Sequence, residues 1–589
     1  MEPIEYKIFL NDLNKHLLVV ECTIKRPNEQ GQIISFPAWV PGSYLIRDFA
    51  RHVVALSVSA NGVAVAVEKT SKSSWQCAPC NGPLVINYSV YCFDLAARGA
   101  YVDHNRVFFD GCRIFLVVEG EEEQTRIVNI VRPQAPQTAN WRCATSMAPY
   151  ATDTEGFGSY IASNHLDLID HPFEISDFKR FDFVVADVPH SLVVTGQAYA
   201  DYARLVQDVT KICLAQIDFF GELPKMTHYI FILSVLAKGG GGIEHKSSCS
   251  LICTRSDLPG FNNATKEEDY KALLGLFSHE YFHLWNVKRI KPEVFINPDL
   301  TREVYTRQLW IFEGFTSYFD NLNLFRAGVI TVTEYLRILQ DDINVFLQTP
   351  GANMQTLQES SFDAWIKYYQ PDENSINSGI SYYLKGALVA LLLDLLIIKN
   401  SKRKQSLVDV MQILWQQYGK AGLGLPEGYF QRILFEVTGE DYASFCDLLI
   451  NTTEELDFVE PLLSVGIVYA TKPAGILDNL GVKVINDQNK VLLRAVLSDS
   501  AAEQAGLAAN DVLVAINGFA VNYINLEMLF NTFKSTELIK IHIFRNEVLR
   551  EIHLYNTIQT KMCCELTLAE NLSQQQSLHQ QKWLGVVNT

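Results

Sequence analysis

The chain has 589 residues, of which 48% are hydrophobic and 20% are charged, a composition typical of globular proteins rather than disordered or fibrous ones. At roughly 100–200 residues per domain, this length predicts three or four domains. The formal net charge of −17 argues against a nucleic-acid partner, because phosphates require an excess of Lys and Arg.

The N-terminus, Met1–Glu5, lacks a basic stretch followed by an apolar run, so no secretory signal is predicted. The longest apolar run, Ala387–Ile398, contains Asp394 and is too short to span a bilayer, so we expect a buried helix there. A cytoplasmic protein without membrane contact is therefore expected. Cys77 and Cys80 form a single CxxC, and a zinc ribbon would need a second one, so we interpret them as unrelated thiols.

Residues 1–165 are predicted to form a β-rich domain. Short apolar or alternating runs at Tyr6–Leu10, His16–Ile24 and Leu84–Tyr91 are separated by clusters of Gly, Asn and Pro. Because no long helical period occurs in this region, we expect a sandwich-like arrangement of strands.

Residues 166–465 are predicted to form a mixed α/β and helical domain. Strands are expected at Phe181–Val185 and Tyr229–Leu236, with a helix at Ala200–Phe220 between them. From residue 265 to about residue 449, helical patterns dominate.

The helix that begins near Thr265 carries the most specific chemical motif. Thr265 and Glu268 form a capping box, which places the start of the helix just before Tyr270. In the sequence His279-Glu-Tyr-Phe-His283, two imidazoles stand at positions i and i+4, on one helix face and one turn apart. Two such rings can converge on one cation, and Glu280 lies beside them within reach of a metal-bound water. This is the HExxH arrangement of zinc peptidases.

A second helix, Trp310–Tyr318, offers a third ligand. Catalytic zinc takes three protein ligands and keeps one open position for water. Glu313 follows His283 by 30 positions, which leaves room for a loop and a returning helix. We therefore predict one zinc ion per chain, bound by His279, His283 and Glu313, a ligand set of the thermolysin type. The alternative is that the two histidines lie on a helix surface and bind no metal.

Zinc lowers the pKa of bound water from about 16 to about 7 and polarises the scissile carbonyl. Glu280 is the predicted general base, which takes the proton of the water and passes it to the leaving amine. The tetrahedral oxyanion needs a further donor, and Tyr383 is our candidate. The alternative is that this tyrosine packs in the core and has no catalytic role.

A run of glycines follows the strand predicted at Tyr229–Leu236. Glycines at Gly240, Gly241 and Gly242 would let a substrate backbone lie close to the edge of that strand, and an extended peptide could pair with it. Glu244 would then neutralise the amino terminus of the substrate. The alternative is a mobile loop with a solvated Glu.

From residue 466 to residue 560 the chain returns to short strands with turn signals. Gly506–Gly518 is predicted to form a turn, a strand and an Asn-Gly turn. Residues 561–589 are rich in Gln and Ser, and we expect them to form a loosely held C-terminal tail.

Six motifs follow one another over most of the chain: Pro41–Arg51, Gly239–His245, His279–Arg289, Glu313–Thr316, Tyr368–Asn374 and Ser381–Gly386. In these motifs the chain resembles the M61 glycyl aminopeptidases, which are gluzincins related to the M1 aminopeptidases. The resemblance implies a multidomain α+β fold with an N-terminal β domain, a thermolysin-like catalytic domain and a C-terminal PDZ-like domain. It also implies zinc and the removal of small N-terminal residues, glycine above all.

The resemblance also implies roles for single residues. Glu244 is similar to the glutamate of the M1 motif GxMEN, which binds the substrate amine, although Ile243 and His245 replace its methionine and asparagine. Tyr383 is similar to the tyrosine of the M1 motif YxKG, which stabilises the oxyanion. In the PDZ-like domain, Leu480–Val482 would form the backbone nest for the C-terminal carboxylate of a peptide ligand. A structural cap without a ligand is equally compatible with the sequence.

The expected partners are peptides with a free N-terminus, with neither nucleic acid nor membrane involved. A zinc endopeptidase, or another gluzincin hydrolase, is the first alternative, and Glu244 speaks against it because an endopeptidase has no amine to anchor. A PDZ-based binding protein with a vestigial peptidase is the second. The presence of all three predicted ligands and the base disfavours it.

Overall fold

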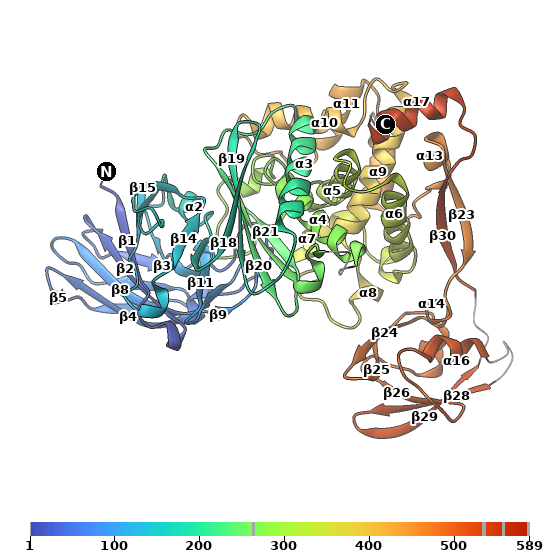
Figure 1. Ribbon diagram of the computed structural model, residues 1–589, viewed down its shortest axis with the longest axis horizontal. Coiled ribbons are helices and arrows are strands. Elements are labelled where there is room, and N and C mark those ends of the chain that lie inside the picture. The colour runs from blue at the N-terminus through green and yellow to red at the C-terminus, as the bar shows by residue number, and fades with distance from the viewer. Residues whose placement is uncertain (1, 262–265, 533–537, 556–559, 586–589) are drawn as a thin grey trace. The chain divides into compact units, whose positions relative to one another are not determined.

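The computed structural model describes residues 2–261, 266–532, 538–555 and 560–585 (Figure 1). Within these ranges, no helix is both long and apolar enough to cross a membrane. The chain divides into two compact units, whose segments alternate along the sequence. Unit 1 consists of Met1–Tyr305, Phe319–Ile330 and Leu414–Pro426, and unit 2 consists of Thr306–Tyr318, Thr331–Ile413 and Glu427–Thr589.

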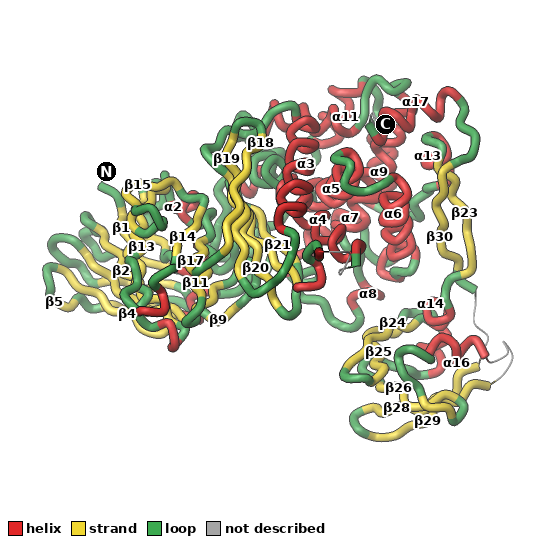
Figure 2. Tube along the Cα trace, viewed as in Figure 1, coloured by secondary structure: helices red, strands yellow, loops and turns green. Residues whose placement is uncertain are grey.

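Unit 1 opens with a β-rich region, which confirms the prediction for the N-terminal part of the chain (Figure 2). Its strands are β1 (Ile4–Phe9), β2 (Leu17–Ile24), β3 (Ile33–Ser35), β4 (Val53–Ala60), β5 (Val63–Ala64), β6 (Val67–Lys69), β7 (Ser74–Cys77), β8 (Leu84–Tyr91), β9 (Phe93–Asp94), β10 (Ala100–Val102), β11 (Arg106–Phe109), β12 (Val117–Val118), β13 (Arg126–Ile130), β14 (Arg142–Thr145), β15 (Ala148–Thr152), β16 (Gly158–Ala162) and β17 (Phe173–Ser176). Two short helices interrupt them, α1 (Gly111–Ile114) and α2 (His165–Leu168).

These strands form three sheets. The largest has the order β15-β16-β13-β1-β2-β8-β4-β5, and the smaller two have the orders β14-β17-β11-β10-β9 and β12-β3-β7-β6. In β2 and β8 every second side chain is buried, as expected for strands with one face on a core. Cys77 is buried and Cys80 half-buried, and both are free thiols.

A separate five-stranded sheet follows, with the order β18-β19-β20-β22-β21. Strand β20 is parallel to both of its neighbours and is buried along almost its whole length, which explains its continuous apolar run. Strand β21 pairs with β22 alone and forms an edge. The sheet edge that a peptide could pair with is therefore β21, which contains the glycine run. We expected a peptide to pair with β20, but that strand lies in the interior of the sheet. The bounds are β18 (Lys179–Val185), β19 (Val188–Thr195), β20 (Tyr229–Leu236), β21 (Gly241–Glu244) and β22 (Ser248–Thr254).

Two long helices of unit 1, α3 (Tyr202–Phe220) and α4 (Glu267–Phe282), pack against each other. Helix α3 begins where Asp201 accepts a hydrogen bond from a first-turn amide, and it ends at Gly221 with φ of 82°. Helix α4 has three acidic residues in its first turn, and their negative charges stabilise the helix by interacting with the positive end of its dipole. Thr265 of the expected capping box lies outside the described residues.

The part of unit 2 before residue 465 is mainly helical. Its central helix, α9 (Tyr382–Asn400), is buried nearly all round, which confirms the buried helix predicted at Ala387–Ile398. Asp394 remains compatible with this burial because its carboxylate accepts hydrogen bonds from Tyr318 Oη at 2.6 Å and from Leu407 N at 2.8 Å. A π-helical turn (Trp310–Gly314) precedes α5 (Phe315–Arg326), and the α-helices that follow up to residue 464 are α6 (Val332–Leu347), α7 (Leu357–Phe362), α8 (Ser375–Ser378), α9, α10 (Leu407–Leu414), α11 (Phe430–Thr438), α12 (Ala443–Asn451) and α13 (Val459–Ser464).

The C-terminal part of unit 2 contains a small domain between two paired strands, β23 (Ile467–Pro473) and β30 (Met562–Leu568). Its main sheet has the order β24-β25-β26-β28-β29 and its own apolar core. Asn517 and Gly518 both have positive φ, 47° and 82°, so the predicted Asn-Gly hairpin turn is confirmed. The elements are α14 (Ile476–Leu480), β24 (Val482–Asp487), β25 (Lys490–Val496), α15 (Ala501–Ala505), β26 (Val512–Ile516), β27 (Phe519–Ala520), α16 (Leu526–Thr532), β28 (Leu538–Arg545) and β29 (Val548–Tyr555).

The nest predicted at Leu480–Val482 coincides with the end of α14. The N–H of Gly481, which such a nest requires, donates to the carbonyls of Leu477 and Asp478 at 3.0 and 3.1 Å. One donor for a carboxylate is therefore already in use. The PDZ-like assignment and its peptide ligand stay predictions.

The residues after 561 differ from the loose tail that we expected. They form β30 and a helix, α17 (Gln574–Leu584), which starts with a capping box between Ser573 and Gln576. Trp583 has an exposed fraction of 0%, and its Nε1 donates to Tyr318 Oη at 2.9 Å. The polar composition was misleading because a single buried tryptophan can anchor an otherwise hydrophilic helix.

Candidate active site

The two histidines of the HExxH motif lie at the end of helix α4. His279 is in its last turn and His283 is its C-cap. Their ring centroids are 4.6 Å apart and the ring planes are nearly perpendicular, at 89°. The i, i+4 spacing has therefore brought both rings to one face of the helix, as predicted.

Each ring is oriented by a hydrogen bond at Nδ1. The Nδ1 of His279 lies 2.9 Å from Asp320 Oδ2, and that of His283 lies 2.6 Å from the carbonyl oxygen of Asn286. Because both acceptors are oxygens, each Nδ1 is placed to donate a hydrogen bond, the arrangement that orients histidines for metal binding. Ser278 donates to the carbonyl of Asp320 at 2.8 Å, so α5 is fixed to α4 at two points. Sequence reasoning missed Asp320 and Asn286.

Glu280 lies against Gly242 of edge strand β21. Its side chain is 5% exposed, and a Cβ built on Gly242 would lie 2.6 Å from its Oε1. Only glycine allows strand β21 to pass so close to this carboxylate. Gly241 has a φ of 105°, whereas a Cβ on Gly240 would meet nothing within 4 Å. The three predicted glycines thus differ: one makes room for the carboxylate, one permits the backbone turn, and one borders open space.

Glu244 ends strand β21 and is 4% exposed. Its carboxylate faces the loop at Gly42, where a Cβ would lie 2.4 Å from Oε1 and where φ is 97°. Among the described residues, Glu244 Oε1 has no hydrogen-bond partner although it is buried. A buried carboxylate oxygen of this kind can accept a hydrogen bond from a water molecule or a ligand.

Glu244, Glu280 and His283 form one cluster within unit 1, since a ligand atom from each lies within 4.8 Å of the others. Two buried carboxylates at this spacing repel each other unless a positive charge lies near them. The cluster therefore suits a cation, either a metal ion or an ammonium group.

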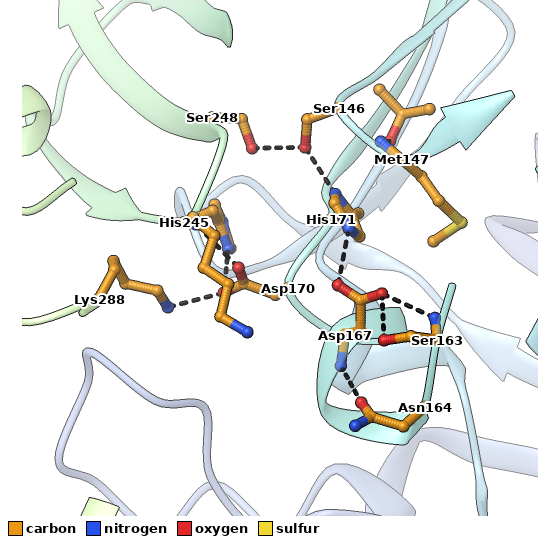
Figure 3. Close-up of polar contacts among 12 residues, drawn as sticks. Ser146, Met147, Ser163, Asn164, Asp167, Asp170, His171, His245, Ser248 and Lys288 are labelled. Atoms are coloured by element: carbon orange, nitrogen blue, oxygen red, sulfur yellow. Dashed lines mark hydrogen bonds and ion pairs between the residues drawn. The ribbon is translucent and has the colours of Figure 1, made fainter. Parts of the chain in front are cut away.

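A charged network surrounds Asp170 (Figure 3), which lines the same cavity as Glu244. Lys288, which is 7% exposed, places its Nζ 2.7 Å from Asp170 Oδ1. His245 Nδ1 lies 3.4 Å from the same oxygen, and the backbone N–H of Lys246 donates to Asp170 Oδ2 at 2.8 Å. Burial would raise the pKa of Asp170, but the Lys288 charge and the His245 hydrogen bond hold that pKa well below its ordinary value. Asp170 is therefore ionised at neutral pH.

In unit 2, two glycines bring Glu313 and Tyr383 together. Glu313 lies in the π-helical turn and is 2% exposed, and Tyr383 lies in the first turn of α9. A Cβ on Gly314 would lie 2.6 Å from the Cα of Gly386, so the π-helical turn and α9 touch backbone to backbone. Any larger residue at either position would separate the two elements.

Tyr383 is a phenol rather than a phenolate. Burial raises its pKa well above 10, and the nearby charge of Glu313 raises it further. The Tyr368 ring stacks on it with centroids 5.1 Å apart, and the Tyr369 hydroxyl lies 3.4 Å from its own. The side chain can therefore donate a hydrogen bond at any physiological pH. The motif Tyr368–Asn374 contributed to the sequence resemblance, but its packing against Tyr383 was not predicted.

Comparison with protein-family profiles gives two matches: M61 glycyl aminopeptidase over residues 272–389, and the peptidase M61 N-terminal domain over residues 5–177. The first range contains the HExxH motif, Glu313 and Tyr383, and the second contains Gly42 and Asp170. Comparison with curated protein sequences gives no match.

Solved structures give two further likenesses. The aminopeptidase N family protein from Idiomarina loihiensis is 34% identical, covers 99% of this chain and 100% of its own, and has a TM-score of 0.94. An M1 zinc metallopeptidase from Deinococcus radiodurans is 11% identical, with 77% of this chain and 95% of that chain covered and a TM-score of 0.49. The second likeness is too distant to support an argument about function.

Proposed function

The chain belongs to the M61 peptidase family, and from this premise we propose that it is a zinc aminopeptidase that removes small N-terminal residues, glycine and alanine above all. The observation that carries the proposal is the cluster of Glu244, Glu280 and His283. It sets a carboxylate with a buried, unsatisfied oxygen beside the predicted base. An exopeptidase needs such a second carboxylate for the substrate amine, whereas an endopeptidase does not.

The proposed zinc ligands are His279, His283 and Glu313. In both histidines Nδ1 is hydrogen-bonded to an oxygen, as in metal-binding histidines, and imidazole with carboxylate is a ligand set that suits zinc. Glu313 precedes Asp320 by seven positions in a helical run that continues from the π-helical turn into α5. Residues seven apart share a helix face at a separation of roughly 10 Å. His279, whose ring is held by Asp320, can therefore bind the same metal ion as Glu313. A bound zinc ion would supply an acidified water and polarise the substrate carbonyl.

Two residues of this chain would move or hold protons. Glu280 takes a proton from the attacking water on its carboxylate and delivers it to the leaving amine. Its place under Gly242 supports this role, because a substrate paired with edge strand β21 would pass directly over it. Tyr383 donates its hydroxyl hydrogen to the developing oxyanion, and its raised pKa keeps that hydrogen in place.

Glu244 sets the position of cleavage. Its buried oxygen accepts a hydrogen bond from the terminal ammonium of the substrate, and its closeness to Glu280 would bring the first peptide carbonyl to the base. The family description, glycyl aminopeptidase, supports the preference for a small first residue.

Matched peptides test the aminopeptidase proposal. Peptides that begin with Gly, Ala, Leu or Arg are compared with their N-acetylated forms by mass spectrometry of the products. We expect release of the first residue alone, Gly and Ala fastest, and at least about a hundredfold lower kcat/KM after acetylation, because Glu244 would be buried against an uncharged group. Internal cleavage, or equal rates on both sets, contradicts the proposal.

Metal analysis tests the ligands separately. The purified protein is expected to hold one zinc ion per chain, and Glu313→Ala is expected to lower the occupancy without unfolding the protein. Because ligands must be deprotonated, the metal is also expected to dissociate at acid pH. Full occupancy in the Glu313→Ala variant would remove this residue from the ligand set.

A further inference from the structure

A cavity of about 90 Å³ in unit 1 contains two opposite charges that do not pair with each other. Glu244 and Lys288 both line it, together with Gly42 and Asp170. Glu244 has an unsatisfied buried oxygen, while Lys288 is bound to Asp170 at 2.7 Å. Within the described part of the chain, no ion pair joins Lys288 to Glu244.

The separation of these two charges needs a cause, because a buried ammonium and a buried carboxylate attract each other strongly. Lys288 is within electrostatic range of both acids. Burial would lower its pKa, but Asp170 and then Glu244 raise the pKa above its ordinary value. Lysine has a flexible stem with a point charge at its end, so rotation of the side chain alone can change its partner. The backbone of Lys288 is held by a hydrogen bond to the carbonyl of His283 at 3.1 Å.

Asp170 is itself fixed from several sides (Figure 3). The amide of Lys246 holds Oδ2, and His245 lies against Oδ1. The next residue, His171, is hydrogen-bonded to Ser146 at 2.7 Å and lies 3.5 Å from Asp167. Asp170 therefore presents an ionised and well-anchored oxygen to Lys288.

We propose that Asp170 is a positioning residue that holds the Lys288 ammonium away from Glu244, so that Glu244 stays open to the terminal ammonium of the substrate. This inference rests on the proposed role of Glu244 as the amine anchor. Lys288 has the same charge and the same donor hydrogens as the substrate terminus. Without Asp170 it becomes a competitor that is tethered beside the site.

A tethered competitor has a specific kinetic signature. It reduces the fraction of enzyme that is ready to bind substrate, so KM rises by the inverse of that fraction while kcat is retained. If Lys288 occupies Glu244 for 90–99% of the time, KM rises by roughly 10- to 100-fold. A distorted active site would lower kcat as well.

The test uses the full-length, zinc-loaded enzyme and a peptide that begins with Ala. Asp170→Asn keeps the shape of the side chain and an oxygen for the Lys246 amide, but it removes the charge that holds Lys288. We expect KM to rise by roughly 10- to 100-fold, with kcat within about threefold and zinc content unchanged. Unchanged KM in a folded Asp170→Asn variant overturns the inference.

The double variant Asp170→Asn/Lys288→Met separates competition from structural damage. Removal of the competitor is expected to return KM to within about threefold of the wild-type value, although two unrelated structural defects would add. A double variant as impaired as the single one, or more so, contradicts the proposal. Asp167→Asn is the matched control, since this carboxylate belongs to the same network but lies against His171 and not Lys288.

Lys288→Met in the presence of Asp170 gives a measurement that does not depend on the folding of Asp170→Asn. KM is expected to stay level or fall, and a rise of about tenfold would mean that Lys288 assists amine binding and would overturn the inference.

The acetylated peptides distinguish failure of this inference from failure of the proposed function. If the wild-type enzyme ignores acetylation, the role of Glu244 fails. If it discriminates and Asp170→Asn keeps its KM, only the role of Asp170 fails.

Discussion

In unit 1 the reactive side chains are held by hydrogen bonds and charges, whereas in unit 2 they are held by the close packing of backbones. His279 and His283 each have an oxygen acceptor at Nδ1, and Glu244 lies beside the ion pair of Lys288 with Asp170. In contrast, Glu313 and Tyr383 are brought together because Gly314 and Gly386 let two helical segments touch. The two kinds of support should fail in different ways. The hydrogen bonds and ion pairs of unit 1 are sensitive to changes of charge and pH, whereas the backbone packing of unit 2 is sensitive to added side-chain volume.

The largest expected effect comes from a change of charge in unit 1 at constant volume. Glu280→Gln is expected to keep the fold and the zinc ion but to lower kcat by about 10²- to 10⁴-fold, at the upper end because one carboxylate serves two proton transfers. Steady-state kinetics and metal analysis of the same preparation check this. Wild-type turnover would show that another group is the base.

In unit 2, Tyr383→Phe removes one hydroxyl without changing the packing of the ring. We expect kcat to fall by about 10²- to 10³-fold with little change in KM, because the oxyanion exists only in the transition state. Tyr369→Phe is the matched control, since its hydroxyl lies 3.4 Å from that of Tyr383 and has no proposed contact with substrate. A higher KM with an unchanged kcat would make Tyr383 a binding residue instead.

A smaller effect is expected when volume is added in unit 2. A Cβ on Gly386 would lie 2.8 Å from the carbonyl oxygen of Trp310, so Gly386→Ala is expected to lower the free energy of unfolding by about 1–3 kcal/mol. In unit 1, a Cβ on Gly275 of helix α4 would have its nearest neighbour at 3.6 Å, and Gly275→Ala is expected to stabilise by about 0.5–1 kcal/mol. Urea unfolding of both variants measures the difference. Equal effects would remove the contrast between the units.

The smallest expected effect concerns pH in the polar network of unit 1. Burial opposes ionisation of Asp167, but hydrogen bonds from His171 and Ser163 lower its pKa from 3.8 to about 2. A depressed carboxyl pKa adds stability above the unfolded pKa, and that stability is lost as pH falls from 3.8 toward 2. Asp167→Asn is therefore expected to lower the free energy of unfolding by about 1 kcal/mol at neutral pH, since partial exposure screens the interaction, and by less below about pH 4. A difference that stays constant down to pH 3 would contradict this assignment.

Sequence reasoning succeeded where the chemistry is local. His279 and His283 are four residues apart on one helix, and the strand at Tyr229–Leu236 has the continuous apolar run of a buried strand. Their structure follows from periodicity, and no distant contact is needed to predict it. The buried helix at Ala387–Ile398 is a case of the same kind.

The parts that escaped prediction depend on contacts between distant residues. Gly42 lies against Glu244, and Asp170 binds Lys288, but neither pair has a spacing that periodicity can reveal. The sequence also misled us about the sheet edge, because the partner of β21 is decided by the turn that follows it. The roles of single site residues, Glu313 and Tyr383 among them, stay proposals that the experiments above can decide.

The packing of helix α17 against Tyr318 and helix α9 gives the chain an order of completion during translation. Domains of a nascent chain generally fold as they leave the ribosome, the N-terminal ones first. The indole of Trp583 closes the core around Tyr318, which lies 265 residues earlier and only five residues after Glu313. Helix α4 is therefore synthesised long before the core beside Glu313 is sealed. A growing copy carries its histidines and Glu280 through about half of its synthesis with this core still open, and it gains the complete packing only after residue 583 has been added.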